Sequence, residues 1–546
     1  MKRNLVAATA LVVLAAAPLR AQESVPVIDT IIIRTADVFT AEEAGKGFYR
    51  FLNSIHVVTR ENVIRDELLF EVGDAFDETV FRETARNLRR REIFKRVDID
   101  TTRIDGKFAV IVDTQDGQSL KPNFSFSIAT DGTWTGRLGV TESNLLGTGS
   151  LASIVYVKEI ERHGPQLAAN FRRIFGSQIR AKGIVSLWND GTDGWWRVGD
   201  PFYSNEDRYS VDYDGEASGR RVLEYRIDST GFRDTTFYRR DALINRLMGV
   251  TAPIAESHHY LRLGFDAWLR QEKYVLCPTN SCNKDTTDFS LVPDSLYAAF
   301  GLWAEYRAAR FQKVQYFNGF IAEDIDQSPR VKLFLNLAPA KLGYERTGLV
   351  PGIDATYGAS GRAGFFVANL KAHGMFTDAG LDSGRVEANV TMGAQLFHRN
   401  STAIYILAGV QDDPAPGQQF SLGFNTPPRS WEANSFVGTR AFWGTLEHRW
   451  FAVDSFLKLF AIGFAGFIDY GGAWYPDQDP RFGGDFGIGL RLGSALGTAA
   501  RTGRIDLGYR FGQGSDVGSR LVLSIGGSFV FPWNPKATDL VKREGP

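Results

Sequence analysis

The segment 460–470 alternates between large apolar side chains and small or polar ones. Its first parity carries the large residues Phe460, Ile462, Phe464, Ile468 and Tyr470, and its second carries Ala461, Gly463, Ala465 and Asp469. Because successive side chains of a β-strand point to opposite faces, a strand here has one apolar face and one polar face. In a membrane β-barrel the apolar face meets lipid and the other face lines the lumen. The pattern therefore predicts a barrel strand with Asp469 facing the lumen.

A carboxylate on the wall of a lumen needs a cationic partner, because a poorly hydrated single charge is costly. The best candidate is Arg429, in the Pro- and Gly-rich loop LGFNTPPRSW (residues 422–431). We expect this loop to enter the barrel and to be held there by an Arg429–Asp469 ion pair. The predicted lumenal loop latch consists of Arg429, Ser430, Trp431, Glu447, Asp469 and Gly471.

The same alternation recurs along most of the chain. Five segments follow Arg429: residues 437–450, 456–474, 482–492, 504–511 and 521–531. At roughly 27 residues per strand with its loop, residues 120–531 accommodate a sixteen-stranded antiparallel transmembrane barrel. The alternative is a soluble array of β-sandwiches in which each charged face meets water. Five such strands in succession favour a lumen, and the 56 glycines, 40 phenylalanines and 11 tryptophans suit strand packing and interfacial aromatic girdles.

The N-terminus has the features of an export signal. Lys2 and Arg3 precede an apolar block at residues 5–17, and Ala21 supplies a small residue for cleavage, so residues 1–21 are predicted to be a signal peptide. No later run reaches the roughly 18–20 apolar residues of a membrane helix. An exported chain without a membrane helix is released, carries a lipid anchor, or forms a membrane β-barrel. The lack of a Cys near the cleavage site argues against a lipid anchor. The formal net charge of -1 gives no reason to expect a nucleic-acid partner.

Residues 27–115 differ from the rest of the chain in their sequence pattern, with helical segments between strand signals, and are predicted to form a separate small α+β domain. Strand signals at residues 28–34, 94–99 and 108–112 flank helices predicted at residues 59–70 and 77–90. Thr59 and Asp77 are expected to cap these helices. Residues 37–55 form an insert between the first strand and the first helix. A plain α+β spacer is the simplest alternative for this domain.

The two cysteines, Cys277 and Cys282, lie in the loop sequence CPTNSC. In an oxidising compartment a local disulfide is the favoured interpretation over a metal or redox role, because the spacing is not that of a CxxC motif.

Several motifs carry a resemblance to a known family. The N-terminal order of elements, with ELLFEVGDAF and LRRREIFKRVDI, resembles a POTRA domain. The segments GRLGVTESNLLGTGS (136–150), SFVGTRAFWGTLEHRWF (435–451) and FIDYGGAW (467–474) resemble the BamA/TamA superfamily of outer-membrane assembly factors, the bacterial surface antigen family. In that family a loop Arg in a (Val/Leu)-Arg-Gly-(Phe/Tyr) motif contacts the Asp of Phe-x-Asp-x-Gly. The matching residues are Arg429 and Asp469, with Ser430 in place of Gly and Trp431 in place of Phe or Tyr.

The resemblance implies a protein that assists the insertion of β-barrel proteins into the bacterial outer membrane, or the passage of a polypeptide across it. It implies a periplasmic POTRA domain and, as partners, the outer-membrane lipid bilayer and unfolded barrel or secreted polypeptides. Periplasmic chaperones or accessory lipoproteins are further possible partners. The rival function is a secretion port or passive transport pore for a dedicated partner.

A barrel can open where its first strand pairs with its last. Gly526 and Gly527 remove two side chains from the predicted last strand, which favours a kink there, although they could simply relieve crowding. The predicted lateral seam consists of Phe124, Phe126, Gly526, Gly527, Phe529 and Phe531. Residues 532–546 form a polar tail. The sequence has no catalytic, phosphate-binding or zinc motif, so we expect no enzyme activity, cofactor or metal.

Overall fold

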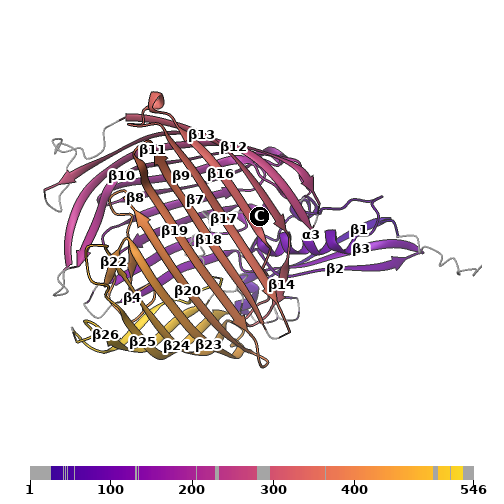
Figure 1. The fold of residues 1–546 in the computed structure, drawn as a ribbon. Coiled ribbons are helices and arrows are strands. Elements are labelled where there is room, and N and C mark those ends of the chain that lie inside the picture. The colour runs from indigo at the N-terminus through magenta and orange to yellow at the C-terminus, as the bar shows by residue number, and fades with distance from the viewer. Residues whose placement is uncertain are drawn as a thin grey trace, which may run out of the picture.

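The computed structural model describes residues 26–532, apart from residues 41, 43–44, 46, 55, 129–131, 133, 205, 228–232, 257, 279–294, 363, 496–501 and 517. The predicted signal peptide (1–21) and nearly all of the polar tail therefore lie outside the described residues. Most of the chain is a single large antiparallel sheet that curves into a barrel (Figure 1). Among the described residues no helix is long and apolar enough to cross a membrane.

The N-terminal domain has a three-stranded sheet in the order β1-β3-β2, with β1 parallel to β3. Its elements are β1 (Thr30–Ala36), α1 (Gly47–Ser54), α2 (Glu61–Arg65), α3 (Glu78–Arg90), β2 (Phe94–Ile104) and β3 (Lys107–Asp116). The prediction for α3 is confirmed, and the Asp77 carboxylate accepts a hydrogen bond from the Thr79 amide at its N-terminus. The predicted helix 59–70 is much shorter, and Thr59 does not cap it. Instead, the Thr59 amide and hydroxyl both donate to Asp116.

In the part of the chain that the structure describes, the barrel contains twenty strands rather than the predicted sixteen. The connections between strands are shorter than assumed; only residues 189–190 separate β8 from β9, for example. The first ten strands are β4 (Leu120–Ile128), β5 (Trp134–Glu142), β6 (Leu151–Lys158), β7 (His163–Phe171), β8 (Arg180–Trp188), β9 (Gly191–Asp200), β10 (Tyr209–Ile227), β11 (Arg233–Ala255), β12 (His259–Cys277) and β13 (Ser295–Ala308).

The other ten strands are β16 (Arg330–Ala338), β17 (Gly348–Ser360), β18 (Gly364–Thr377), β19 (Gly380–Ala394), β20 (Asn400–Asp412), β23 (Arg440–Phe456), β24 (Phe460–Trp474), β25 (Gly483–Ser494), β26 (Gly503–Gly512) and β27 (Leu521–Gly527). The five strands predicted after Arg429 are thus present as β23 to β27. The described residues also form two short hairpins that are not part of the barrel wall. They are β14 (Phe311–Val314) with β15 (Glu323–Asp326), and β21 (Phe420–Leu422) with β22 (Phe436–Gly438).

The circle of strands is completed where β27 lies beside β4. Every other pair of neighbouring barrel strands shares a ladder of paired residues. β27 and β4 are also hydrogen-bonded neighbours, but the contact between their described residues is the least extensive of any two neighbouring barrel strands. This seam is therefore the place where the described part of the wall is held together least extensively.

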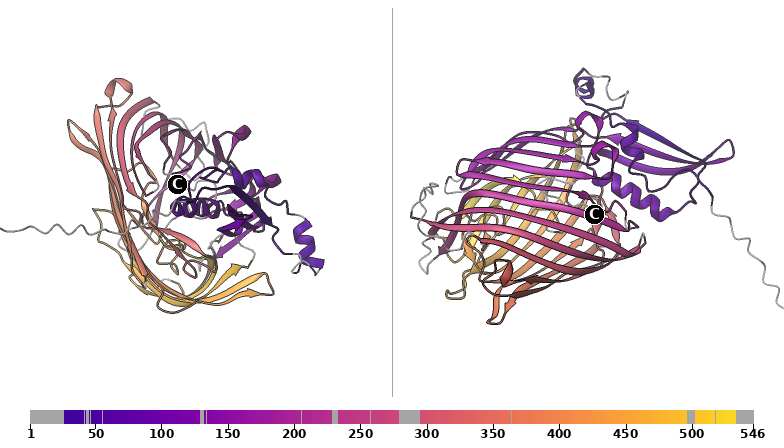
Figure 2. Two further views of the ribbon diagram at one scale, coloured as in Figure 1. Left: turned by 90° about the vertical axis from the view of Figure 1, so that its right-hand side faces the viewer. Right: turned by 90° about the horizontal axis from the view of Figure 1, so that it is seen from above.

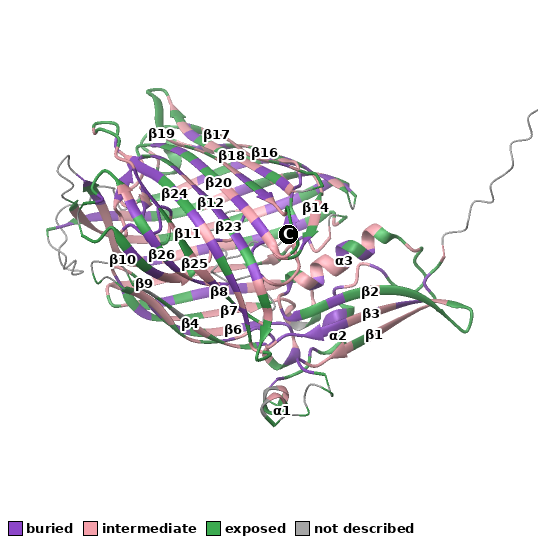
Figure 3. Cartoon of the chain, turned by 90° about the horizontal axis from the view of Figure 1, so that it is seen from below, coloured by how far each residue is buried: buried purple, intermediate pink, exposed green. Residues whose placement is uncertain are grey.

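Buried and exposed residues alternate along the barrel strands (Figure 3). In β24 the large apolar parity, from Phe460 to Tyr470, is exposed on the outside, whereas Asp469 on the other parity is fully buried. The alternation predicted for these strands is therefore confirmed. An apolar exterior around a polar, filled interior is the arrangement expected of a barrel surrounded by lipid.

The N-terminal domain lies at one open end of the barrel (Figures 1 and 2). The Arg60 amide donates to the Gly147 carbonyl, 3.0 Å away in the β5–β6 turn, and Asn87 of α3 donates to the Tyr203 carbonyl at 3.0 Å in the β9–β10 connection. From the insert 37–55, the Tyr49 hydroxyl donates to the Leu457 carbonyl in the β23–β24 turn at 3.2 Å. Because antiparallel strands alternate in direction, the β20–β23 connection, which carries Arg429, must enter from the opposite end.

The junction between domain and barrel contains a buried carboxylate, Glu67. Arg91 donates to it, and Arg173 from the β7–β8 turn lies 3.9 Å away. Burial opposes ionisation of Glu67, but Arg91, Arg172 and Arg173 outweigh burial and hold its pKa below the ordinary value. A lowered pKa stabilises the folded junction above the unfolded pKa of about 4.3, and this stabilisation is lost as the pH falls through the folded value.

We therefore expect acid to loosen this junction. In circular dichroism at the helical band, the thermal midpoint of the N-terminal domain should fall as the pH is lowered from about 5 to about 3. Glu67→Gln should lower the midpoint at neutral pH and flatten this pH dependence, whereas Glu71→Gln, an exposed matched control, should leave both unchanged. An unaltered pH profile in Glu67→Gln would show that another group is responsible.

Candidate functional site

The connection between β20 and β23, residues 413–439, folds back inside the barrel. Its hairpin β21–β22 contacts β24, and β22 also contacts β10 on the opposite wall. At its tip Arg429, Ser430 and Trp431 are all buried. The Trp431 ring packs against Phe436 with centroids 4.9 Å apart. These contacts place the loop within the ring of barrel strands.

Arg429 and Asp469 are in direct contact. The Arg429 Nε and Nη2 atoms donate to the two carboxylate oxygens of Asp469 at 2.7 and 3.0 Å. Both side chains are fully inaccessible to solvent, and the guanidinium also lies 4.0 Å from the centre of the Phe467 ring. A bidentate, charge-assisted pair of this kind has a fixed geometry as well as a strong attraction.

Asp469 is one of three carboxylates around Arg429. Nη1 also donates to Glu447 at 2.7 Å and to Asp506 at 3.3 Å, while Nη2 donates to Thr445 at 3.1 Å. The loop is thus tied to β23, β24 and β26 together. The sequence-based prediction included Glu447 in the latch but did not give it this central position.

Glu447 is the hub of the network. It accepts hydrogen bonds from Arg449 at 2.8 Å and from Arg491 at 2.9 and 3.0 Å, in addition to Arg429. Asp506 in turn accepts from Arg491 at 2.5 Å and from Arg504 at 2.8 Å. Alternating charges of both signs let buried ions compensate one another, whereas loss of any one leaves its neighbours unpaired.

Asp485 is a functional residue that the sequence analysis did not assign to the latch. Its carboxylate accepts a hydrogen bond from the Ser430 amide at 2.7 Å, and it is the cross-strand partner of Asp469 in the β24–β25 ladder. Trp431 adds a further link to β25, because its indole nitrogen donates to the Gly484 carbonyl at 3.0 Å. The lumenal parity of Asp485 was the signal in the sequence that could have indicated this role.

Ser430 stands where the related motif has Gly, yet it needs no glycine-like backbone. It is not among the described non-glycine residues with positive φ. Space for its side chain comes from Gly508 on β26, where an added Cβ would lie 2.1 Å from the Ser430 hydroxyl oxygen. Gly508 on the barrel wall therefore provides the room that Ser430 needs at the loop tip, where the related motif has the smaller Gly.

We expect Gly508→Val to disturb this contact. The added side chain overpacks the loop tip and should cost about 1–3 kcal/mol in unfolding free energy. Combining it with Ser430→Gly should recover part of that loss, as measured by denaturant unfolding in detergent. Equal instability of the single and double variants would place the clash elsewhere.

Gly471 does not contact the loop in the way expected. It makes room for the neighbouring strand, since an added Cβ would lie 2.4 Å from the Cβ of Trp443. Its role is therefore in packing β24 against β23.

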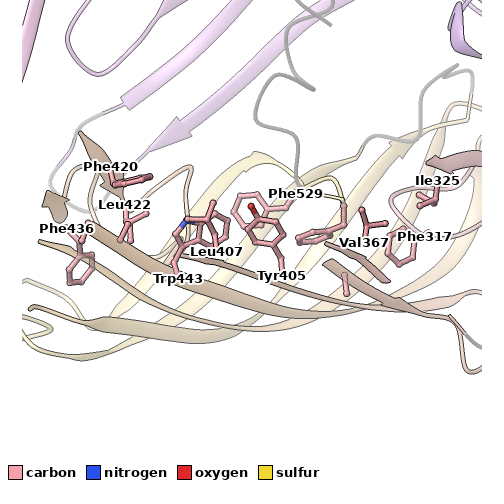
Figure 4. Packing of buried hydrophobic residues seen from close by; sticks show 14 of the residues in the cluster. Phe317, Ile325, Val367, Tyr405, Leu407, Phe420, Leu422, Phe436, Trp443 and Phe529 are labelled. Carbon is pink, nitrogen blue, oxygen red and sulfur yellow. The ribbon is translucent and has the colours of Figure 1, made fainter. Parts of the chain in front are cut away.

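The predicted seam residues separate into two groups. Phe124 and Phe126 on β4 are exposed, with 77% and 37% of their surfaces accessible, and Gly526 and Gly527 on β27 pair with Arg504 and Gly503 of β26. Phe529 and Phe531 do not lie on the seam. The last strand ends at Gly527, four residues before the predicted end, and both rings are buried in one hydrophobic cluster with Tyr405 and Trp443. Figure 4 shows Phe529 in this cluster.

Cys277 is the last residue of β12 and is disulfide-bonded. Cys282 lies outside the described residues.

Comparison with known proteins shows likeness only in solved structures. No family model and no curated protein matches the chain. BamA from Haemophilus ducreyi lacking POTRA domains 1-3 is 12% identical over 91% of this chain and 84% of its own, with a TM-score of 0.40. CdiB from Acinetobacter baumannii is 11% identical over 92% and 73%, with a TM-score of 0.42. CdiB from Escherichia coli is 12% identical over 92% and 76%, with a TM-score of 0.48.

Proposed function

We propose that this chain is an outer-membrane barrel that assists the insertion or translocation of polypeptides through a lateral seam between β4 and β27. The observation that carries the proposal is that the contact between the described residues of these two strands is the least extensive of any neighbouring pair in the barrel. A short pairing is the easiest part of the wall to separate, and separated strand edges are a template for an incoming β-strand.

The filled lumen supports this function over that of a passive pore. The loop that carries Arg429 enters from one end and is held by buried ion pairs. At the other end, helix α3 is bound to hairpin β14–β15 by the pair Arg89–Asp324 at 3.0 Å. A chain that reaches the membrane by a sideways opening does not require an open channel along the barrel axis.

In this proposal the N-terminal domain lies in the periplasm and the Arg429 loop enters from the outside. The clients are unfolded barrel or secreted polypeptides, with periplasmic chaperones or accessory lipoproteins as possible further partners. The bilayer contacts the exposed apolar parity of the strands.

Site-specific crosslinking in cells tests the seam. A photoreactive amino acid at Phe124 of β4 or at Leu523 of β27 should capture polypeptide clients rich in β-strands. The matched control is Leu333 on β16, which is equally exposed on the outer wall at 54%, compared with 55% for Leu523. Clients captured equally at all three positions, or at none, would contradict a lateral seam. Clients captured only by photoreactive amino acids that face the lumen would favour a secretion port.

Single-channel conductance tests the filled lumen. The parent protein should show a small conductance, and Arg429→Ala should raise both its size and its fluctuations, because the loop loses its partners on three strands. A stably wide pore in the parent protein would instead favour a passive transport function.

A further inference from the structure

The chain beyond β27 changes direction and returns into the barrel. We refer to residues 528–531 as the return segment. Within it, Phe529 retains 7% exposure and Phe531 none. The Phe531 ring lies 6.4 Å from the ring of Tyr405 on β20, five strands from β27 in the barrel order. Figure 4 shows Phe529 beside Tyr405 within this cluster.

Polar contacts hold the return segment in this position. Asn318, in the turn of hairpin β14–β15, donates through Nδ2 to the Phe531 carbonyl at 2.6 Å and accepts from the Phe531 amide at 2.8 Å. Arg449 donates to the Phe529 carbonyl at 2.7 Å. The Glu323 carboxylate orients Asn318 by accepting from its amide and side-chain nitrogens at 2.8 and 2.9 Å.

The same hairpin is bound on its other side by the N-terminal domain. Arg89 of α3 donates twice to Asp324, at 3.0 and 3.1 Å. Arg86 of α3 lies over the Phe311 ring at 4.0 Å. The hairpin thus lies between α3 and the return segment and contacts both.

The return segment also contacts the latch. The Phe529 ring lies 4.5 Å from the Arg429 guanidinium and 5.1 Å from that of Arg504. Contacts therefore run without a gap from α3, through the hairpin and the return segment, to the loop that enters from the opposite end of the barrel.

The sequence gives the return segment a second possible conformation. On β27, Leu521 and Leu523 are exposed on the outside, and Phe529 and Phe531 continue their parity. If the strand extended to residue 531, both rings would face lipid and the backbone would lengthen the edge that faces β4. Two discrete arrangements of this kind are what a switching element requires.

We propose that the return segment is a switch through which docking of the N-terminal domain controls the latch and the seam. While α3 holds the hairpin, Asn318 and Arg449 keep the segment in the lumen, where Phe529 supports Arg429. When α3 releases the hairpin, the segment leaves the lumen and extends β27, which alters the edge offered at the seam. The switch itself does not depend on the identity of a client, but its effect on client entry rests on the proposed function.

Electron paramagnetic resonance distances test this switch in the full-length protein. One nitroxide replaces Val530 and a reference nitroxide replaces Asp378, which is exposed in the β18–β19 turn. The parent protein should give one dominant distance. Arg89→Ala, which lies in the N-terminal domain, and Asn318→Ala should each add a second distance and increase its share about threefold or more over the parent level.

Asn389→Ala is the matched control, because Asn389 is hydrogen-bonded to Asn369 on the barrel wall. It should leave the distances unchanged, and Arg89→Lys, which keeps the charge but not the double hydrogen bond, should give an intermediate share. Folding of each variant is checked by heat-modifiable electrophoretic mobility. A parent-like distance distribution in Arg89→Ala would overturn the coupling even if Asn318→Ala were misfolded.

The two proposals fail separately. If the distances respond to Arg89→Ala but Phe124 captures no client, the switch stands and the proposed function falls. If Phe124 captures clients in the parent and in Arg89→Ala alike, with one unchanged distance, the seam stands and the switch is wrong.

Discussion

Asp469→Arg is expected to release the lumenal loop. The substitution places a second guanidinium group beside that of Arg429, in the position of its present bidentate partner. The side chains at both positions are inaccessible to solvent. Breaking a buried ion pair by removing one partner typically costs about 3–5 kcal/mol, and reversal of the charge adds repulsion. Residues 413–439 should become cleavable by protease added from outside intact cells, while the barrel strands remain resistant.

Asp378→Arg provides the control for this variant. Asp378 forms an exposed ion pair with Arg346 at 3.2 Å, and surface pairs of this kind contribute about 0–1 kcal/mol. Its reversal should leave the loop protected. Equal protease sensitivity in the two variants would mean that cleavage reports general loss of folding.

The charge swap is a sharper test of the pairing, and the structure changes its expected result. The sequence suggested that adding Arg429→Asp to Asp469→Arg would restore part of the loss. However, an Asp at position 429 would lie beside Glu447 and Asp506, which now bind Arg429 at 2.7 and 3.3 Å. We therefore expect the double variant to recover little protection, and substantial recovery would show that Asp469 alone holds the loop.

Local periodicity explains what could be predicted of this site. Because the side-chain period of a strand is two residues, the sequence alone placed Asp469 on the lumenal face, and the same alternation applies to Glu447 and Asp485. It could not show that a single arginine reaches carboxylates on three strands, since this depends on the stagger of β23 to β26 and on the depth of the loop.

Two errors arose where local patterns compete with distant contacts. The alternation of β27 continues to Phe531, yet the strand ends at Gly527, because Asn318 and Arg449 bind the backbone of residues 529–531. Asn318 is distant in the sequence, so no local pattern reveals this contact. The predicted number of strands was wrong because it assumed one average length for a strand with its loop, whereas the loops before Arg429 differ in length.

Glu447→Gln should give the largest loss of stability of any substitution that neutralises a single carboxylate in the lumen. Glu447 accepts hydrogen bonds from Arg429, Arg449 and Arg491, and none of these groups is accessible to water. An amide has only one acceptor oxygen and no charge, so three cations would remain close together with incomplete compensation. The expected cost of at least about 3–5 kcal/mol should appear as a large fall in the denaturant midpoint of the purified barrel.

The matched control is Glu387→Gln on β19, because Glu387 is a partly exposed wall residue that pairs with a single arginine, Arg385, at 2.7 Å. Its effect should stay within about 1 kcal/mol. A further comparison separates charge from hydrogen bonding: adding Arg491→Met to Glu447→Gln removes one of the three uncompensated cations and should recover part of the stability. If the double variant is less stable than Glu447→Gln, repulsion among these arginines is not the source of the loss, and Arg491 contributes chiefly through its bond to Asp506.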